Sequence, residues 1–413
     1  GTVLSDRGVE VATADCMRLM GRRSGVLGEW AFRRFITSSL YDSFHQRQLV
    51  GPGIIGPLAD SVAASRMRAA LRAEAERFRP DVIVAVFATG VAGACHLKQE
   101  GLCHKVGVFL PDAMAHRMWV REDVDLFLAT SPLGAASIHR YWPEAPVVTV
   151  DAPIDARFHA APRRADARRA LGLHPDSSCV LLMGGGWGIG QLDRIAESLA
   201  SDGHQVIAVA GNNPRMFDRL RKSAQRVPGI TAIGFSREVP LLMSACDVVV
   251  TTSGATCREA RAMGRGLILL DLIPGHGREN LIHQLASTDA AVVSLNPEII
   301  RRGVNAFLAH RSTARYPDQR LTPSLRPLLN AFRALGVAIT DRPTPAQPPQ
   351  TSLPLLRHQP HDPAPPGSPS PTYPAAALTT QGSGSTDGHQ PENLLSHGAR
   401  TNPAPGRWTG LSH

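Results

Sequence analysis

Three short turns in the second half of the chain have the residue composition of phosphate-binding loops. The first, residues 184–190, reads GGGWGIG and separates an apolar run from a helical segment. Glycines there let backbone N–H groups approach a phosphate at a helix N-terminus, where the dipole favours negative charge. A tight turn without a ligand is the alternative. NAD binding is disfavoured, because no frame gives G-x-G-x-x-G and the next strand lacks a ribose-binding acid.

The second and third turns are residues 253–256 and 274–280, and each follows an apolar run. The hydroxyl groups of Ser253 and Thr256 can cap the helix that follows or, with its first N–H groups, bind an anion. Glu259 stands at capping-box spacing from Thr256, so reciprocal capping is the alternative to a ligand contact. Three such turns at successive strand ends predict a site for a nucleotide and a group attached to it.

Asp112 and His116 follow an apolar strand in the first half of the chain. The carboxyl ends of parallel strands face the ligand in open α/β folds, and a carboxylate or imidazole there can accept a proton from a hydroxyl group. Asp112 is the first candidate for that role and His116 the second. A helix cap and a surface histidine are the alternatives.

A basic, aromatic stretch covers residues 17–50, with six arginines against two acidic residues, a net charge of +4. Arginine beside aromatic side chains suits an anionic membrane surface, which predicts membrane contact by Trp30, Phe32, Arg33, Arg34 and Phe35. An amphipathic helix packed on its own domain is the alternative. Nucleic-acid binding is not expected from the total charge of +9, because only three of the 44 basic residues are lysines, a bias typical of genome composition.

Metal binding and disulfides are not expected either. Cys95-His96 and Cys103-His104 match no usual zinc spacing, and neighbouring residues of a helix point in different directions. The six cysteines are spread thinly over 413 residues, as in a reducing compartment. No apolar run reaches the roughly 18 residues of a membrane span, and no secretory signal is present, so the default location is the cytoplasm.

These residues are positioned by apolar runs that alternate with helical segments, the pattern of parallel sheets covered on both faces. The expected strands are residues 9–13, 82–87, 106–110, 124–129, 147–150, 179–183, 206–210, 231–234, 248–251, 267–270 and 291–294. They predict two doubly wound α/β domains, residues 1–150 and 151–335. Residues 343–413 hold nearly half of the 33 prolines and no hydrophobic periodicity, and this tail is predicted to be disordered.

Taken together, the segments resemble the glycosyltransferases that make monogalactosyl- and monoglucosyl-diacylglycerol, relatives of the peptidoglycan N-acetylglucosaminyltransferase. The resemblance covers roughly residues 1–310. It rests on the GGGWG turn, Gly234-Phe235, Thr256-x-x-Glu259, Ile273-Pro274-Gly275 with Asn280, Pro80-Asp81 and Asp112-x-x-x-His116-x-x-Trp119.

The resemblance implies a GT-B fold, with two Rossmann-like domains facing across a cleft. It also implies an inverting transfer of a hexose from UDP-glucose or UDP-galactose to diacylglycerol, without a metal or other cofactor, at the inner face of the plasma membrane. The implied donor contacts are Gly184, Gly185, Gly186 and Trp187 near the diphosphate, Phe235 beside the uracil, Ser253, Gly254, Ala255 and Thr256 around the diphosphate, Glu259 on the ribose, and Pro274, Gly275, His276 and Asn280 near the sugar.

The chain departs from this family at three places. The turn at Ser253 is one residue shorter, and His276-Gly277 stands where Gln-Glu is usual. The family's N-terminal glycine turn, with its acid/base histidine, would precede Gly1, so the first β-α unit is expected to be missing and the chain to be an incomplete enzyme. A transferase acting on a lipid-linked precursor or a natural product, and a non-catalytic nucleotide-sugar binder, are the alternatives.

Overall fold

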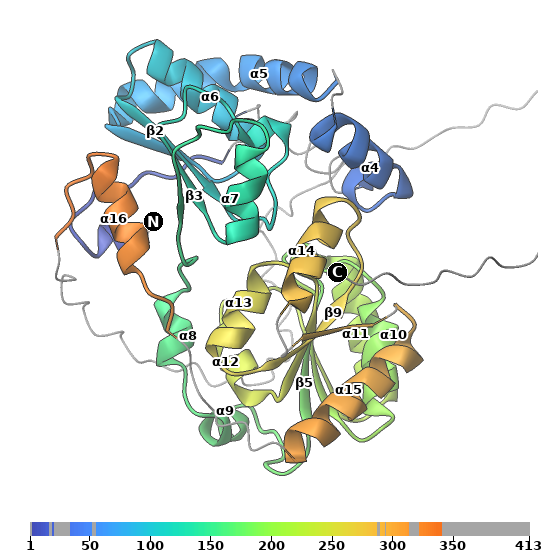
Figure 1. The fold of residues 1–413 in the computed structure, drawn as a ribbon. Coiled ribbons are helices and arrows are strands. Elements are labelled where there is room, and N and C mark those ends of the chain that lie inside the picture. Colours follow the sequence, from blue (N-terminus) through green and yellow to red (C-terminus); the bar gives the residue numbers. More distant parts are fainter. Residues whose placement is uncertain are drawn as a thin grey trace, which may run out of the picture. The chain divides into compact units, whose positions relative to one another are not determined.

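The computed structural model describes residues 2–15, 19, 34–51, 55–286, 290–293, 295–313 and 322–340. Within these residues ten strands form two parallel sheets, one of four strands and one of six (Figure 1). The predicted membrane residues Trp30, Phe32 and Arg33 and the proline-rich tail lie outside the described residues.

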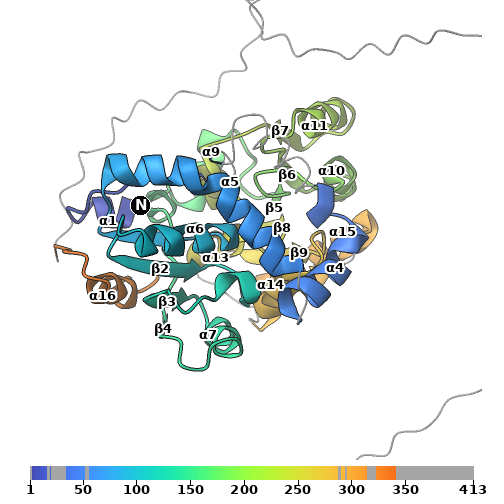
Figure 2. The ribbon, with the colours of Figure 1, turned by 90° about the horizontal axis from the view of Figure 1, so that it is seen from above.

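The first sheet has the strand order β1-β2-β3-β4, and all its pairs are parallel. Its strands are β1 (Val82–Ala85), β2 (Lys105–Leu110), β3 (Leu126–Ala129) and β4 (Val147–Thr149). Helix α6 (Ala88–Gln99) packs on β1 and β2, and α5 (Ile55–Phe78) packs on α6 (Figure 2). The short η2 (Arg117–Trp119) follows β2, and α7 (Pro132–His139) joins β3 to β4. One face of the sheet is therefore covered by helices of the same half of the chain.

The opposite face of the first sheet is covered by the last described helix, α16 (Arg326–Ala334). Its Leu328 and Phe332 are buried in one cluster with Leu126 and Leu128 of β3. Leu4 of α1 (Thr2–Ser5) packs against the same cluster. The predicted boundary at residue 335 groups α16 with the second domain, but its apolar side packs on the first sheet.

The second sheet has the order β10-β9-β8-β5-β6-β7. Its strands are β5 (Cys179–Met183), β6 (Gln205–Val209), β7 (Ile230–Ile233), β8 (Val248–Thr251), β9 (Gly266–Leu270) and β10 (Ala290–Val293). This is the order of the doubly wound nucleotide-binding fold, with its reversal between β5 and β8. Ligands of such sheets bind at the carboxyl ends of the strands beside this reversal.

Helices cover both faces of the second sheet because its strands are apolar on both sides. Val180 and Leu182 of β5 pack toward α10 (Leu192–Ala200), α11 (Pro214–Arg226) and α15 (Pro297–Thr313), whereas Leu181 packs toward α12 (Val239–Ala245) and α13 (Ala255–Ala262) (Figure 1). The other helical segments are α4 (Ser39–Phe44), the π-helix η1 (His45–Val50), α8 (Ala156–Ala160), α9 (Arg164–Ala170) and α14 (His276–Leu285).

The predicted fold class, two parallel sheets each enclosed by helices, is confirmed. Ten of the eleven predicted strands are present, each with ends within two residues of the prediction. The strand predicted at residues 9–13 is wrong: these residues have no strand structure and are mostly exposed, and β1 is the edge of its sheet, so they lack a paired neighbour.

None of the five described cysteines forms a disulfide. Among the described helices, none combines the length and apolar character needed to cross a bilayer.

Candidate functional site

A cavity of about 530 Å³, here called the central pocket, is lined by residues that follow strands of both sheets. Asp112 follows β2 and Thr130 follows β3 in the first sheet, and residues 253–255 follow β8 in the second. Asn280 of α14 lines the pocket as well. Five predicted site residues therefore meet in one cavity: Asp112, Ser253, Gly254, Ala255 and Asn280.

The turn after β8 presents a helix N-terminus to the central pocket. Helix α13 begins at Ala255 with Gly254 as its N-cap, and no side chain of the described residues caps it. The Ser253 hydroxyl instead donates to the Gly277 carbonyl (2.8 Å). Thr256 lies inside the helix, so the predicted side-chain caps and the capping box with Glu259 are wrong. No N-cap side chain occupies the N–H groups of Ala255 and Thr256, which can therefore meet an anion, whereas the Cys257 N–H donates to the Gly254 carbonyl (3.1 Å).

Two arginines of α13, Arg258 and Arg261, line the same pocket and were missed in the sequence. Arg258 donates to the Pro111 carbonyl (3.4 Å), and burial lowers the pKa of its guanidinium. Arg261 donates to the Gln284 carbonyl (3.1 Å). Their spacing of three residues, which places them on one helix face, was the available signal. Guanidinium groups beside a helix N-terminus form a favourable setting for phosphate oxygens.

The side chains of Asp112 and Asn280 form a direct link across the pocket wall. Asn280 Nδ2 donates to Asp112 Oδ1 (3.0 Å), and the backbone N–H of Ala113 donates to Asn280 Oδ1 (2.6 Å). These two bonds fix which end of the Asn280 amide carries the oxygen. Asp112 accepts from a side chain of another element, which is a different role from the helix cap considered above.

His116 lies in a group of three histidines and is largely buried, so the alternative of a surface histidine is wrong. Its ring centroid is 6.0 Å from that of His45, which is in turn 6.3 Å from that of His276. Burial, and to a smaller extent the other two imidazoles, lower the pKa of His116 to about 3. The imidazole is therefore neutral near pH 7. Its Nδ1 is buried and has no hydrogen-bond partner among the described residues.

The α4–η1 segment supplies three side chains to the turn at the start of α14, and the sequence did not indicate this. The Tyr41 hydroxyl lies 2.9 Å from His276 Nδ1, and His45 Nε2 lies 2.9 Å from Glu279 Oε1. Asp42 Oδ1 accepts from the backbone N–H of Gly275 (3.0 Å). Pro274 precedes this contact, and Gly275 has a left-handed φ of 62°.

Two of the predicted membrane residues are described. The Phe35 ring packs edge-on against the rings of Tyr41 and Phe44, with centroids 5.3 and 5.2 Å apart. Both contacts are made within the basic, aromatic stretch itself. Arg34 is exposed.

The glycine turn after β5 is folded on itself. A side chain at Gly188 would collide with the Ala210 carbonyl, and its φ of 54° is left-handed. A side chain at Gly184 would likewise collide with the backbone of Ile189. Gly186, in contrast, is exposed, and an added Cβ there would find open space. The tight-turn interpretation therefore accounts for at least two glycines without a ligand.

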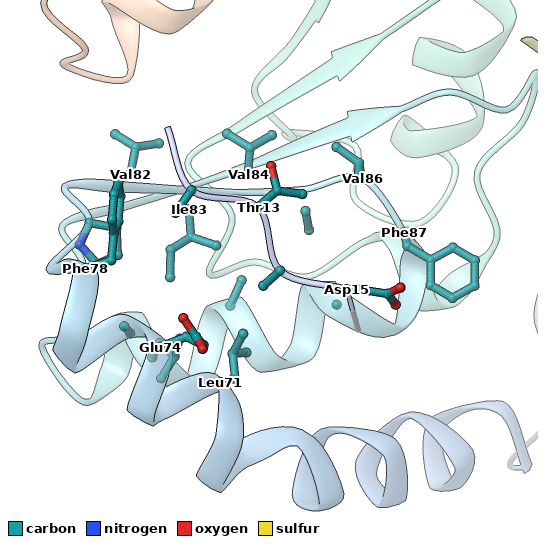
Figure 3. Close-up of a pocket in the computed structure, with 18 of the residues that line it drawn as sticks. Thr13, Asp15, Leu71, Glu74, Phe78, Val82, Ile83, Val84, Val86 and Phe87 are labelled. Carbon is teal, nitrogen blue, oxygen red and sulfur yellow. The ribbon is translucent and has the colours of Figure 1, made fainter. Parts of the chain in front are cut away.

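Trp187, in the same turn, lines a different cavity of about 460 Å³. Figure 3 shows Thr13 and Asp15 between the β1 segment and α5 at this cavity, which is mostly apolar. Phe235, 62% exposed, and Glu259 do not line the central pocket. Burial raises the pKa of Glu259, while the neighbouring Arg258 acts in the opposite sense. The structure thus brings together only part of the predicted donor site.

No group of three or more His, Cys, Asp and Glu side chains in the described part of the chain is arranged to hold a metal ion.

Comparison with known proteins gives consistent relatives, although no family model matches the chain. It is 31% identical over 161 residues to a probable monogalactosyldiacylglycerol synthase 2 of Oryza sativa subsp. japonica, covering 36% of this chain and 34% of that protein. It is 26% identical over 234 residues to the processive diacylglycerol beta-glucosyltransferase of Bacillus pumilus, covering 55% and 61%. The chain thus spans between a third and two thirds of the length of these relatives.

Solved structures show the fold. The UDP-GlcNAc 2-epimerase from Neisseria meningitidis bound to UDP-GlcNAc has a TM-score of 0.53 at 12% identity, with 67% of this chain and 82% of that chain covered. A putative UDP-N-acetylglucosamine 2-epimerase from Listeria monocytogenes has a TM-score of 0.51 at 13% identity, with 67% and 80% covered. With the curated relatives, they confirm the resemblance found in the sequence: the chain has a GT-B fold and is similar to the monogalactosyl- and glucosyl-diacylglycerol synthases.

Proposed function

We propose that the protein is an inverting glycosyltransferase that moves a hexose from UDP-glucose or UDP-galactose to diacylglycerol. The observation that carries the proposal is the central pocket, where a carboxylate after a strand of the first sheet meets a helix N-terminus and two arginines of the second. The names of the curated relatives add the substrate class, because they are diacylglycerol glycosyltransferases.

The donor diphosphate is assigned to the start of α13. The turn of Ser253, Gly254, Ala255 and Thr256 would hold it there, with the backbone N–H groups of Ala255 and Thr256 as donors and Arg258 as a positive charge, whereas the Gly254 N–H donates to the Thr252 carbonyl (2.8 Å). Glu259, which the structure frees from a capping role, remains the proposed acceptor for the ribose hydroxyls. We further propose that the glycine turn with Trp187 lies near the diphosphate and that Phe235 lies beside the uracil.

Asp112 is the proposed base. Asn280 occupies its Oδ1, which leaves Oδ2 for the hydroxyl of the acceptor. In the transfer, this carboxylate takes the hydroxyl proton, the hydroxyl oxygen bonds to the anomeric carbon, and the bond from that carbon to UDP breaks with the electron pair on UDP. Positive dipoles and guanidinium groups stabilise the leaving diphosphate. The lowered pKa of His116 suits a neutral hydrogen-bonding role better than proton uptake.

Diacylglycerol resides in membranes, so we propose that the protein works as a peripheral membrane protein at a cytoplasmic membrane face. Arg34 and Arg47 are the exposed arginines of the basic stretch, residues 17–50, among the described residues, and both suit an anionic surface.

The test is UDP release from UDP-glucose and from UDP-galactose with diacylglycerol in anionic vesicles, alongside calorimetric UDP binding. The 413-residue chain, an upstream-extended form, Asp112→Asn and Glu259→Ala are compared. We expect Asp112→Asn to abolish release while UDP binding stays, and Glu259→Ala to weaken binding. Release with another acceptor but none with diacylglycerol would identify a different transferase. UDP binding without release, by either length of chain and with any acceptor, would identify a non-catalytic binder.

A further inference from the structure

We propose that Tyr41 and His45 are positioning residues that set the hydrogen-bonding state of His276 and Glu279 in the first turn of α14, and so tune recognition of the donor sugar. The inference rests on the proposed function, with the donor sugar placed near His276 and Asn280 as the family resemblance implies.

The contact between the two segments is specific and made by side chains. Tyr41 and His45 are four residues apart, on one side of a continuous helical segment, and meet His276 and Glu279 at 2.9 Å each. Asp42 adds a bond to the Gly275 N–H. Tyr41 is 5% exposed and His45 is fully buried. Deeply buried polar groups are costly unless they are paired, which favours the bonds of the Tyr41 hydroxyl and His45 Nε2, whereas His45 Nδ1 is buried without a partner among the described residues.

Tyr41 selects the tautomer of His276. Burial, followed by the charges of Asp112 and Glu279, raises the pKa of the Tyr41 hydroxyl, so it stays protonated. Burial also lowers the pKa of His276, which keeps the imidazole neutral. A phenol is a stronger acid than a neutral imidazole N–H, so the hydroxyl donates to Nδ1. The proton of His276 is then on Nε2, which makes that atom a donor toward a sugar hydroxyl.

His45 holds Glu279 by a related arrangement. A carboxylate only accepts hydrogen bonds, so His45 Nε2 carries the proton that bridges to Glu279 Oε1. Without His45, the carboxylate of Glu279 would lose its buried partner and could turn toward other groups of the histidine cluster.

These effects reach the central pocket through α14. His276 and Asn280 are four residues apart and share a helix face, and Asn280 lines the pocket. A change in the donor character of His276 therefore alters a group beside the proposed sugar position, and leaves the diphosphate contacts of α13 in place.

The decisive variant is Tyr41→Phe, with Tyr141→Phe as the matched control. The Tyr141 hydroxyl donates to the Val50 carbonyl (3.1 Å) at the end of the same segment, so its loss tests docking of the segment alone. In wild-type protein labelled with ¹⁵N-histidine, we expect His276, assigned with His276→Gln, to show the Nε2–H tautomer. Tyr41→Phe should shift it toward a tautomer mixture, and Tyr141→Phe should not.

Binding gives the second readout. We expect Tyr41→Phe to weaken the affinity for UDP-glucose or UDP-galactose about 3–10-fold, the usual worth of one hydrogen bond, with UDP affinity unchanged. His45→Ala should weaken UDP-sugar affinity similarly, and His45→Gln, whose amide can still donate to Glu279, should restore part of it. An unchanged tautomer in Tyr41→Phe, or equal losses for UDP and UDP-sugar, would overturn the inference. Failure of wild-type protein to bind any UDP-sugar would overturn the proposed function instead, and the tautomer would still report on Tyr41.

Discussion

Replacing Asn280 with aspartate tests the link between the two sheets at the central pocket. In the wild-type protein, Asn280 Nδ2 donates to Asp112 Oδ1 at 3.0 Å. Asn280→Asp removes this hydrogen bond to a charged acceptor, worth about 1.5–3 kcal/mol, and puts a second carboxyl group in its place. At this separation two negative charges repel by about 5 kcal/mol for an effective dielectric constant near 20.

The penalty has an upper limit because the pair can take up a proton. If the new carboxyl group of the Asn280→Asp variant is protonated, it donates to Asp112 and restores the hydrogen bond. The unfolded-state pKa of an aspartate is about 3.9, and each pH unit above it costs about 1.36 kcal/mol, so protonation at pH 7 costs about 4 kcal/mol. The same cost is about 1.5 kcal/mol at pH 5. The folded-state pKa of the pair is raised, so the variant is stabilised at low pH and loses stability as pH rises through that pKa.

The assay is urea unfolding of wild type, Asn280→Asp and Asn280→Ala at pH 5, 6 and 7. We expect Asn280→Asp to be less stable than wild type by about 3–4 kcal/mol at pH 7 and by 1.5 kcal/mol or less at pH 5. Asn280→Ala loses the bonds without adding charge, so its difference from wild type should be nearly independent of pH. A penalty for Asn280→Asp that is equal at pH 5 and pH 7 would show that the two side chains are not in contact.

Three further outcomes are expected. Glu259→Ala should weaken UDP binding about 10-fold or more by calorimetry, because a carboxylate that accepts from ribose hydroxyls is lost, whereas the exposed Glu122→Ala should leave it unchanged. Gly188→Ala should lower the free energy of unfolding by at least about 2 kcal/mol, because its Cβ has no room and its φ is left-handed, and Gly186→Ala, with open space, should cost much less in the same urea titration. Arg34→Glu should reduce sedimentation with anionic vesicles and leave sedimentation with neutral vesicles unchanged, because it reverses an exposed positive charge of the proposed membrane surface.

The sheets were predictable because buried parallel strands have a strong and local signal. Residues 179–183 and 248–251 are continuous apolar runs, and both strands have the predicted ends. The failed prediction at residues 9–13, Val-Glu-Val-Ala-Thr, covers a stretch of similar length but includes a charged residue, and a strand also needs a neighbour to hydrogen-bond with. Whether a neighbouring strand is present depends on the arrangement of the whole sheet, which the local sequence pattern does not show.

The site was predictable only in part, for a similar reason. Turns after strands revealed Asp112, Ser253 and Asn280, because the topology of parallel sheets brings strand ends together. The contacts of Tyr41 and His45 join positions more than 200 residues apart, and no spacing rule predicts such a pair. Their aromatic and basic neighbours instead suggested a membrane surface, a pattern that a packed helix shares.

The packing of α16 on the first sheet has a consequence for synthesis of the protein. The ribosome makes β3 some 200 residues before the Leu328 and Phe332 that cover it. Until then, one apolar face of the nascent first sheet lacks this cover, while the intervening second sheet, whose helices are all encoded next to it, can already fold as a unit. The second sheet is therefore expected to fold before the first, the reverse of the usual N-terminal-first order. While the first sheet is incomplete, its uncovered apolar face is where chaperones would bind or aggregation would begin.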